Sequence, residues 1–144
     1  MRSYIVDASV ATRFLIEEDL GVEALSVADA YIAGKLDLFA PSIITYEVGN
    51  ALRTAVARGV MTDVQATEQF SFFIGMQLGR LSFGEDDHEA ILRLSLSKRF
   101  SYYDGAYVWA SRNSGVPLLT ADKRQVTLAR GEVEVIHLKD FNNS

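Results

Sequence analysis

The 144-residue chain contains no cysteine, which excludes disulfide bonds, thiolate zinc sites, iron–sulfur clusters and a cysteine nucleophile. Histidine is almost as scarce, and the two residues present, His88 and His137, are too far apart to build a zinc site without other ligands. We therefore assign neither histidine a catalytic role and expect any metal site to use oxygen ligands.

Long apolar runs are also missing from the sequence. No segment approaches the ~20 apolar residues that span a membrane, and residues 1–7 lack the apolar stretch of a signal peptide. We expect a cytoplasmic protein without membrane contact. With 49% hydrophobic and 23% charged residues and only two prolines, the composition is that of a globular chain, and its length predicts a single domain over residues 1–144.

Positive charge is in short supply, because 14 basic residues face 19 acidic ones and the net charge is −5. This sign argues against nucleic-acid binding by bulk electrostatics. The objection weakens if four acids belong to a metal site, because the remaining 15 acidic residues then nearly balance the 14 basic ones.

Apolar stretches of strand length alternate along the chain with helical patterns. The strands are predicted at Tyr4–Val6, Leu36–Ala40, Arg80–Phe83, Pro117–Thr120 and Val133–Ile136, and the helices at about 8–17, 21–34, 42–58, 62–78, 86–99, 103–114 and 122–129. This alternation predicts an α/β fold with a parallel sheet covered by helices on both faces.

Three aspartates are expected at the carboxyl edge of that sheet, where open α/β sheets bind their ligands. Asp7 follows the first strand, Asp122 follows the fourth, and Asp104 opens the helix that continues from Gly105. Each aspartate taken singly is best explained as a helix cap, as Ser42 is for the helix 42–58, and Gln125 completes a capping box with Asp122.

Glu47 does not fit the cap explanation, because it lies inside the helix 42–58 beside the apolar stripe, with Asn50 next to it. Four converging carboxylates would repel one another unless protonated or joined by divalent cations, and such oxygen ligands favour Mg²⁺ or Mn²⁺. Ser9 and Thr120, each two residues from an aspartate, could orient a carboxylate or simply bond the backbone.

At these residues the sequence resembles the PIN-domain ribonucleases, and among them the VapC-type toxins of toxin–antitoxin pairs. The matching blocks occur in family order, at Ile5–Val10, Ala40–Leu52, Tyr103–Tyr107 and Leu118–Lys123. The resemblance implies a three-layer α/β/α sandwich on a central parallel sheet, with Asp7, Glu47, Asp104 and Asp122 as catalytic residues and metal ligands. Ser9, Asn50 and Thr120 would support them.

The same resemblance implies an endoribonuclease that uses Mg²⁺ or Mn²⁺, takes RNA as its substrate and is inhibited by a cognate antitoxin. A homodimer is expected as well. Apolar residues of the helix 62–78, such as Phe72 and Ile74, point around most of its circumference. Either that helix is wholly internal, or part of it is covered by a second copy or an antitoxin segment.

Three other protein classes are alternatives to this interpretation. A phosphoacceptor receiver domain would have paired acids after the first strand, where Asp7 is followed by Ala8. A haloacid-dehalogenase-type phosphatase needs a second aspartate where Ser9 stands. The alternative that remains is a non-catalytic PIN-fold module that binds RNA or protein, and metal-dependent RNA cleavage would separate it from the enzyme.

Overall fold

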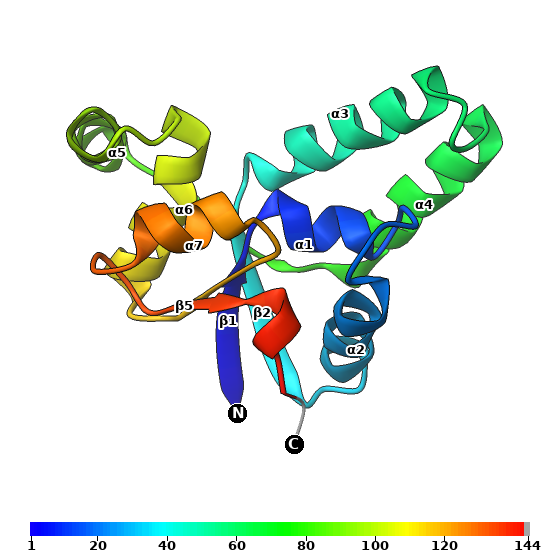
Figure 1. The fold of residues 1–144 in the computed structure, drawn as a ribbon, viewed down its shortest axis with the longest axis horizontal. Helices are drawn as coiled ribbons and strands as arrows, with labels where there is room; N and C mark the ends of the chain where they lie inside the picture. Colours follow the sequence, from blue (N-terminus) through cyan, green and yellow to red (C-terminus); the bar gives the residue numbers. More distant parts are fainter. Residues whose placement is uncertain (143–144) are drawn as a thin grey trace.

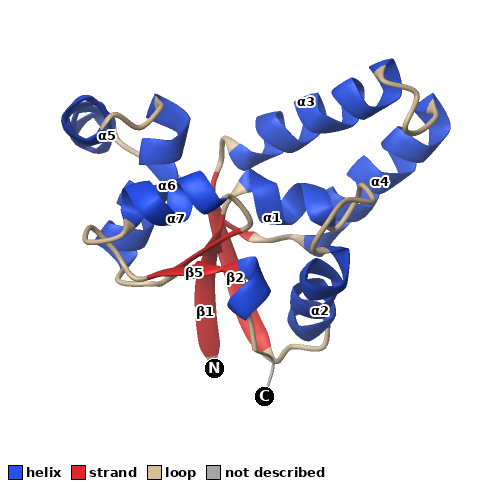
Figure 2. Ribbon diagram, viewed as in Figure 1, coloured by secondary structure: helices blue, strands red, loops and turns tan. Residues whose placement is uncertain are grey.

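A five-stranded parallel sheet forms the centre of the protein in the computed structural model, which describes residues 1–142 (Figures 1 and 2). The strand order is β3-β2-β1-β4-β5, and every neighbouring pair is parallel. The strands are β1 (Arg2–Val6), β2 (Leu36–Pro41), β3 (Gly79–Leu81), β4 (Leu118–Thr120) and β5 (Val135–His137). The predicted parallel sheet is confirmed.

The connections between strands form the two outer layers. They contain the helices α1 (Ala8–Arg13), α2 (Gly21–Ile32), α3 (Ile44–Ala57), α4 (Asp63–Met76), α5 (Glu85–Lys98), α6 (Tyr102–Ser114) and α7 (Lys123–Ala129), followed by a 3₁₀ turn at Leu138–Asp140. Right-handed crossovers place α1 to α4 on one face of the sheet and α5 to α7 on the other (Figure 1). This is the α/β/α sandwich that the sequence predicts.

The chain leaves β1 toward β2 on one side and reaches β4 on the other, so the crossovers diverge between β1 and β4. Ile5 pairs with Leu118 and Val6 with Leu119. The residue after β1, Asp7, therefore lies beside the end of β4. A parallel sheet binds its ligands outside the carboxyl ends of the strands at such a point.

The two central strands are buried on both faces. Ile5, Val6, Leu118 and Leu119 are fully inaccessible to solvent, which explains why these segments read as unbroken apolar runs rather than as an alternating pattern. Removing these side chains from water is the main force that holds the carboxyl edge of the sheet in place.

The predicted C-terminal end of the first helix is wrong. The helix predicted at 8–17 ends at Arg13, although Phe14, Leu15 and Ile16 are buried. Apolar periodicity continues past the end of this helix because those side chains enter the core without helical backbone. The helix predicted at about 86–99 is observed at Glu85–Lys98, with Gly84 as its N-cap, and agrees with the prediction within one residue.

Two predicted caps are also wrong. Ser42 does not cap α3, whose N-cap is Ile43 without a side-chain hydrogen bond; the Ser42 hydroxyl donates weakly to Leu81 O instead. The helix predicted to open at Asp104 begins at Tyr102, and Ser101 caps it by accepting from the Asp104 amide at 3.0 Å. Asp104 is therefore not the cap of α6.

Helices α3 and α4 form a hairpin that projects beyond the sheet (Figure 1). Along α4 only Phe73 and Met76 are buried, whereas Phe72 and Ile74 are each 46% exposed. The alternative that this helix is wholly internal is therefore wrong. Across residues 1–142, no helix has the length and apolarity needed to cross a membrane.

Candidate active site

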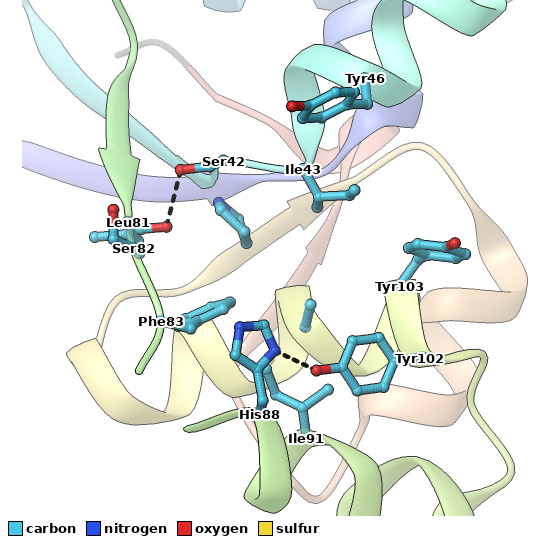
Figure 3. A pocket seen from close by; sticks show the side chains of 12 residues that line it. Ser42, Ile43, Tyr46, Leu81, Ser82, Phe83, His88, Ile91, Tyr102 and Tyr103 are labelled. Atoms are coloured by element: carbon cyan, nitrogen blue, oxygen red, sulfur yellow. Dashed lines mark hydrogen bonds between the residues drawn. The ribbon is translucent and has the colours of Figure 1, made fainter. Parts of the chain in front are cut away.

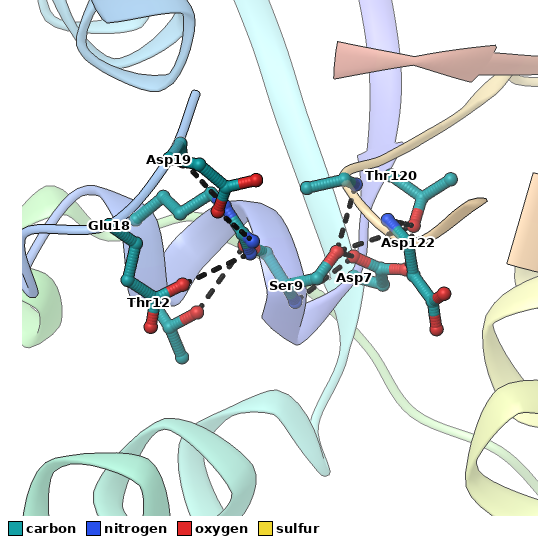
Figure 4. A network of polar contacts seen from close by, with 9 residues as sticks. Asp7, Ser9, Thr12, Glu18, Asp19, Thr120 and Asp122 are labelled. Atoms are coloured by element: carbon teal, nitrogen blue, oxygen red, sulfur yellow. Dashed lines mark hydrogen bonds and ion pairs between the residues drawn. The ribbon is translucent and has the colours of Figure 1, made fainter. Parts of the chain in front are cut away.

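Asp7 is the most deeply buried of the four acids and the centre of a hydrogen-bond network (Figure 4). Its Oδ1 accepts from the Ser9 amide at 3.1 Å and from the Ser9 hydroxyl, and its Oδ2 accepts from the Thr120 hydroxyl. Burial raises the pKa of Asp7 to about 6, although the bonds from Ser9 and Thr120 act in the opposite direction.

The two hydroxyls that contact Asp7 also fasten the loop after β4. Ser9 Oγ accepts from the Ala121 amide at 2.9 Å, and Thr120 Oγ1 accepts from the Asp122 amide at 3.1 Å. The segments at the ends of β1 and β4 are thereby locked together. Both alternatives that the sequence leaves open are therefore observed, since each hydroxyl contacts a carboxylate and bonds the backbone. Thr120 contacts Asp7 rather than its neighbour in sequence, Asp122.

Glu47 lies in the first turn of α3 rather than in the helix interior, and it is half-buried. Its Oε1 accepts a hydrogen bond of 2.6 Å from the Tyr107 hydroxyl on α6. Burial raises the pKa of Glu47, the Tyr107 bond lowers it, and the charge of Asp104 raises it again. Asn50, one turn further along α3, is exposed; its supporting role stays a prediction.

Asp104 and Asp122 stand at the starts of α6 and α7. Asp104 is half-buried, and desolvation raises the pKa of its carboxyl, as does the nearby charge of Asp122. Asp122 is exposed and is the N-cap of α7, where its Oδ1 accepts from the Arg124 amide at 2.9 Å. Arg124 also brings its guanidinium to 3.9 Å from Asp104 Oδ2.

Asp104 interacts electrostatically with each of the other three carboxylates. Its charge raises the pKa of both Asp7 and Glu47, and the charge of Asp122 raises that of Asp104. The structure therefore brings all four predicted acids, from four different elements, to the carboxyl edge of the sheet. Like charges assembled in this way are unfavourable unless protons or cations compensate them.

The donor set suits a hard divalent cation, because it consists of carboxylate oxygens with hydroxyls behind them. Within residues 1–142, however, no three histidine or acidic side chains are grouped closely enough to hold a metal ion. Asp7 is turned toward Ser9 and Thr120, and Glu47 toward Tyr107. The residues thus fit Mg²⁺ or Mn²⁺ by chemistry, and closing on one ion requires side-chain rotation.

Sequence reasoning missed two residues at this site. Tyr107 is 2% exposed and bonds Glu47, which places it within the acidic group. Gln125, predicted to complete a capping box with Asp122, instead points inward, where its Nε2 donates to Asp104 O at 3.3 Å and its Oε1 is buried without a partner among the described residues. The apolar neighbours of Tyr107 in sequence, Ala106 and Val108, indicate its burial but not its contact with Glu47.

No protein-family model matches the chain, and no curated protein matches its sequence. Solved structures do match its fold. PAE2754 from Pyrobaculum aerophilum is 21% identical, with a TM-score of 0.71 over 96% of this chain and 92% of the other. VapBC2 from Rickettsia felis, solved bound to a DNA fragment from its promoter, is 9% identical, with a TM-score of 0.67 over 94% and 98%.

A third match is FitAcB from Neisseria gonorrhoeae, which is 14% identical with a TM-score of 0.64 over 96% of this chain and 99% of the other. These structures contain PIN-domain toxin proteins. The likeness extends over nearly the whole of each chain, so the protein has the PIN fold. The predicted resemblance is confirmed at the level of the fold.

Proposed function

We propose that the protein is an endoribonuclease that depends on Mg²⁺ or Mn²⁺ and acts as the toxin of a toxin–antitoxin pair. The observation that carries this proposal is the convergence of Asp7, Glu47, Asp104 and Asp122 on one edge of the sheet, with Asp104 electrostatically coupled to the other three. A protein without catalytic activity would gain nothing from holding four like charges together, because their repulsion and partial burial lower its stability.

The four carboxylates would hold the cation, which when bound supplies charge neutralisation and an acidified water for attack on a phosphodiester. The chain's own residues prepare this arrangement. Ser9 and Thr120 fix the Asp7 carboxylate, and Tyr107 fixes Glu47. The choice of RNA as substrate rests on the resemblance of the four sequence blocks to PIN-domain ribonucleases.

The purified protein should cleave single-stranded RNA in Mg²⁺ or Mn²⁺ and leave 5′-phosphate and 3′-hydroxyl ends. Asp104→Asn should remove this activity without unfolding the protein, and EDTA should silence the wild type. Asp86→Asn, which alters an exposed carboxylate on α5, is the matched control and should cleave normally. Full cleavage by Asp104→Asn or in EDTA would contradict the proposal.

A non-catalytic PIN-fold module is the competing function. It would bind RNA or a protein in EDTA and in Mg²⁺ alike, with no cut strands at any enzyme concentration. The same cleavage assay therefore decides between the two functions.

The toxin assignment is supported by the structural neighbours, one of which is VapBC2 bound to a DNA fragment from its promoter. We propose a cognate antitoxin as the protein partner. Co-expression with the product of an adjacent short reading frame should give a stable complex that no longer cleaves RNA. An uninhibited nuclease in that complex would leave the enzyme proposal standing and remove the toxin role.

A further inference from the structure

A cavity of about 370 Å³ opens beside the acidic site, between the ends of β2 and β3 and the helices α3, α5 and α6 (Figure 3). Its volume lies in the range of small-molecule sites. Five of its twelve lining residues carry aromatic rings, and none of the twelve is a lysine, arginine, aspartate or glutamate. The aromatic side chains are Tyr46, Phe83, Tyr102 and Tyr103, together with the His88 ring.

The rings of this cavity are arranged in two ways. His88 stacks on Tyr102 with 9° between the ring planes and a hydrogen bond between His88 Nδ1 and the Tyr102 hydroxyl, and Phe83 meets His88 edge-on. Tyr46 and Tyr103 are different, because they are 76% and 54% exposed. Two large aromatic faces are therefore left open to a ligand.

The open rings adjoin the carboxylates along the chain. Tyr46 directly precedes Glu47 on α3, and Tyr103 directly precedes Asp104 on α6. Figure 3 shows the two tyrosines projecting from these helices at the same side of the cavity, with Phe83 across from them. A planar group bound between these rings could therefore belong to a polymer whose backbone lies against the four carboxylates.

We propose that this cavity binds one unstacked nucleobase of single-stranded RNA, next to the phosphodiester that is cleaved. The inference rests on the proposed nuclease function and adds a recognition site to it. A nucleobase is flat and neutral, with polar edges, which matches an uncharged aromatic cavity bordered by the hydroxyls of Ser42 and Ser82. Sequence-specific readers of RNA bind splayed bases by stacking them on aromatic side chains.

The cavity also offsets the acidic character of the neighbouring site. Carboxylates repel the phosphates on either side of the scissile bond, and Arg124, a cation at this edge, pairs with Asp104 at 3.9 Å. Stacking contributes affinity that depends neither on positive charge nor on the metal. This accounts for how a chain of net charge −5 can hold RNA.

The test measures binding in EDTA, so that cleavage plays no part. A short single-stranded RNA carrying one 2-aminopurine is titrated with the full-length protein, and stacking of that base quenches its fluorescence. The wild type should quench the probe. Tyr103→Ala and Tyr46→Ala should bind roughly five- to hundredfold more weakly, the range for one lost base–aromatic stack, without quenching.

Conservative variants show whether the ring itself is responsible. Tyr103→Phe and Tyr46→Phe keep the aromatic face and should bind and quench like the wild type. Leu96→Ala removes an exposed apolar side chain of α5 outside the cavity and should also have no effect. All variants are compared by thermal unfolding, so that a misfolded protein is recognised.

The outcomes separate this inference from the proposed function. Quenching without any cleavage in Mg²⁺ supports the base site and removes the nuclease. Normal cleavage and binding by both alanine variants overturn the base site and leave the nuclease. Variants that bind RNA normally but lose the antitoxin overturn the proposal as well, because the cavity then belongs to the protein partner.

Discussion

The hydroxyl of Tyr107 donates a 2.6 Å hydrogen bond to Glu47 Oε1, joining α6 to α3 across 60 positions of sequence. Burial and the negative charge of Glu47 both raise the pKa of Tyr107 far above its usual range, so the phenol stays a donor at every accessible pH. Tyr107 is therefore a fixed support for the ionised form of Glu47.

Tyr107→Phe removes this donor from a half-buried carboxylate. Since the bond lowers the pKa of Glu47, its loss should raise that pKa and shift the acid limb of the pH–rate profile for RNA cleavage to higher pH. Stability should fall by about 1–3 kcal/mol, as for a lost hydrogen bond to a charged group. The pH profile of cleavage and urea unfolding measure the two effects.

Tyr31→Phe is the matched control for that variant. It also removes a tyrosine hydroxyl that donates a hydrogen bond, in this case to Gln77 O at 2.9 Å. Its pH profile should coincide with that of the wild type. An unshifted profile in Tyr107→Phe would mean that Glu47 does not need the phenol.

Asp7→Asn should stabilise the protein in EDTA at neutral pH. The pKa of Asp7 is about 6 in the folded state against an ordinary value of 3.8, so the buried charge costs stability above pH 6. That cost disappears as the pH falls from 6 toward 3.8, because the folded protein binds the proton first. The gain at pH 8 is up to about 3 kcal/mol, with little difference left near pH 4.

Asp122→Asn provides the comparison, because it alters an exposed carboxylate and asparagine is an equally good N-cap. Removing its charge relieves only the repulsion on Asp104, so the melting temperature in EDTA at pH 8 should rise less than for Asp7→Asn. Equal melting temperatures for Asp7→Asn and wild type at pH 8 would show that the Asp7 carboxylate is not under strain.

Gly105 sets the distance between α5 and α6 immediately after Asp104. A methyl group at this position would overlap Ser95 Oγ, which donates to Ile91 O at 2.7 Å. Gly105→Ala should therefore destabilise the protein by about 1–3 kcal/mol, as overpacking does. Ser95→Ala alone should cost about 1 kcal/mol through the lost hydrogen bond.

The double variant Ser95→Ala with Gly105→Ala gives the clearest measurement. Removing the hydroxyl makes room for the new methyl group, so the double variant should be more stable than Gly105→Ala alone in urea unfolding. Simply additive losses would show that the helices do not meet at this pair.

The exposed apolar side chains of α4 predict self-association. We expect the wild type to be a dimer in sedimentation equilibrium, and Phe72→Asp to raise the dissociation constant about tenfold or more, since a charge would replace part of a buried contact. Leu96→Asp, on the exposed side of α5, should leave the dimer unchanged. A wild type that stays monomeric at high concentration would rule out this surface.

Short unbroken apolar runs predict the central strands because these strands are buried on both faces, and the acids follow from their positions at strand and helix ends. Asp7 and Asp122 are local features of this kind, and the fold places them where the sequence predicts. The contacts of Tyr107 and Gln125 are not predicted, because they depend on which helices pack against each other. Local sequence patterns do not indicate which helices will be neighbours in the fold.

Caps were the least reliable part of the sequence reading, because several polar residues near one helix start can serve. Ser101, for example, caps the helix that the sequence predicts to open at Asp104. The aromatic cavity was hidden for a further reason, since its rings come from three helices and one strand end. Only the packing of α5 against α6 brings His88 to Tyr102.

The hydrogen bond between Asp7 and Thr120 joins residues 113 positions apart, so it can form only late in the synthesis of the chain. A ribosome delivers Asp7 first and β4 almost last, and a domain folds as a unit. Until β4 inserts beside β1, the Asp7 carboxylate lacks one of its two hydroxyl partners and Asp122 is not yet in place. The acidic site is therefore completed only when the last fifth of the chain has been made, and the nuclease activity that we propose would begin only then.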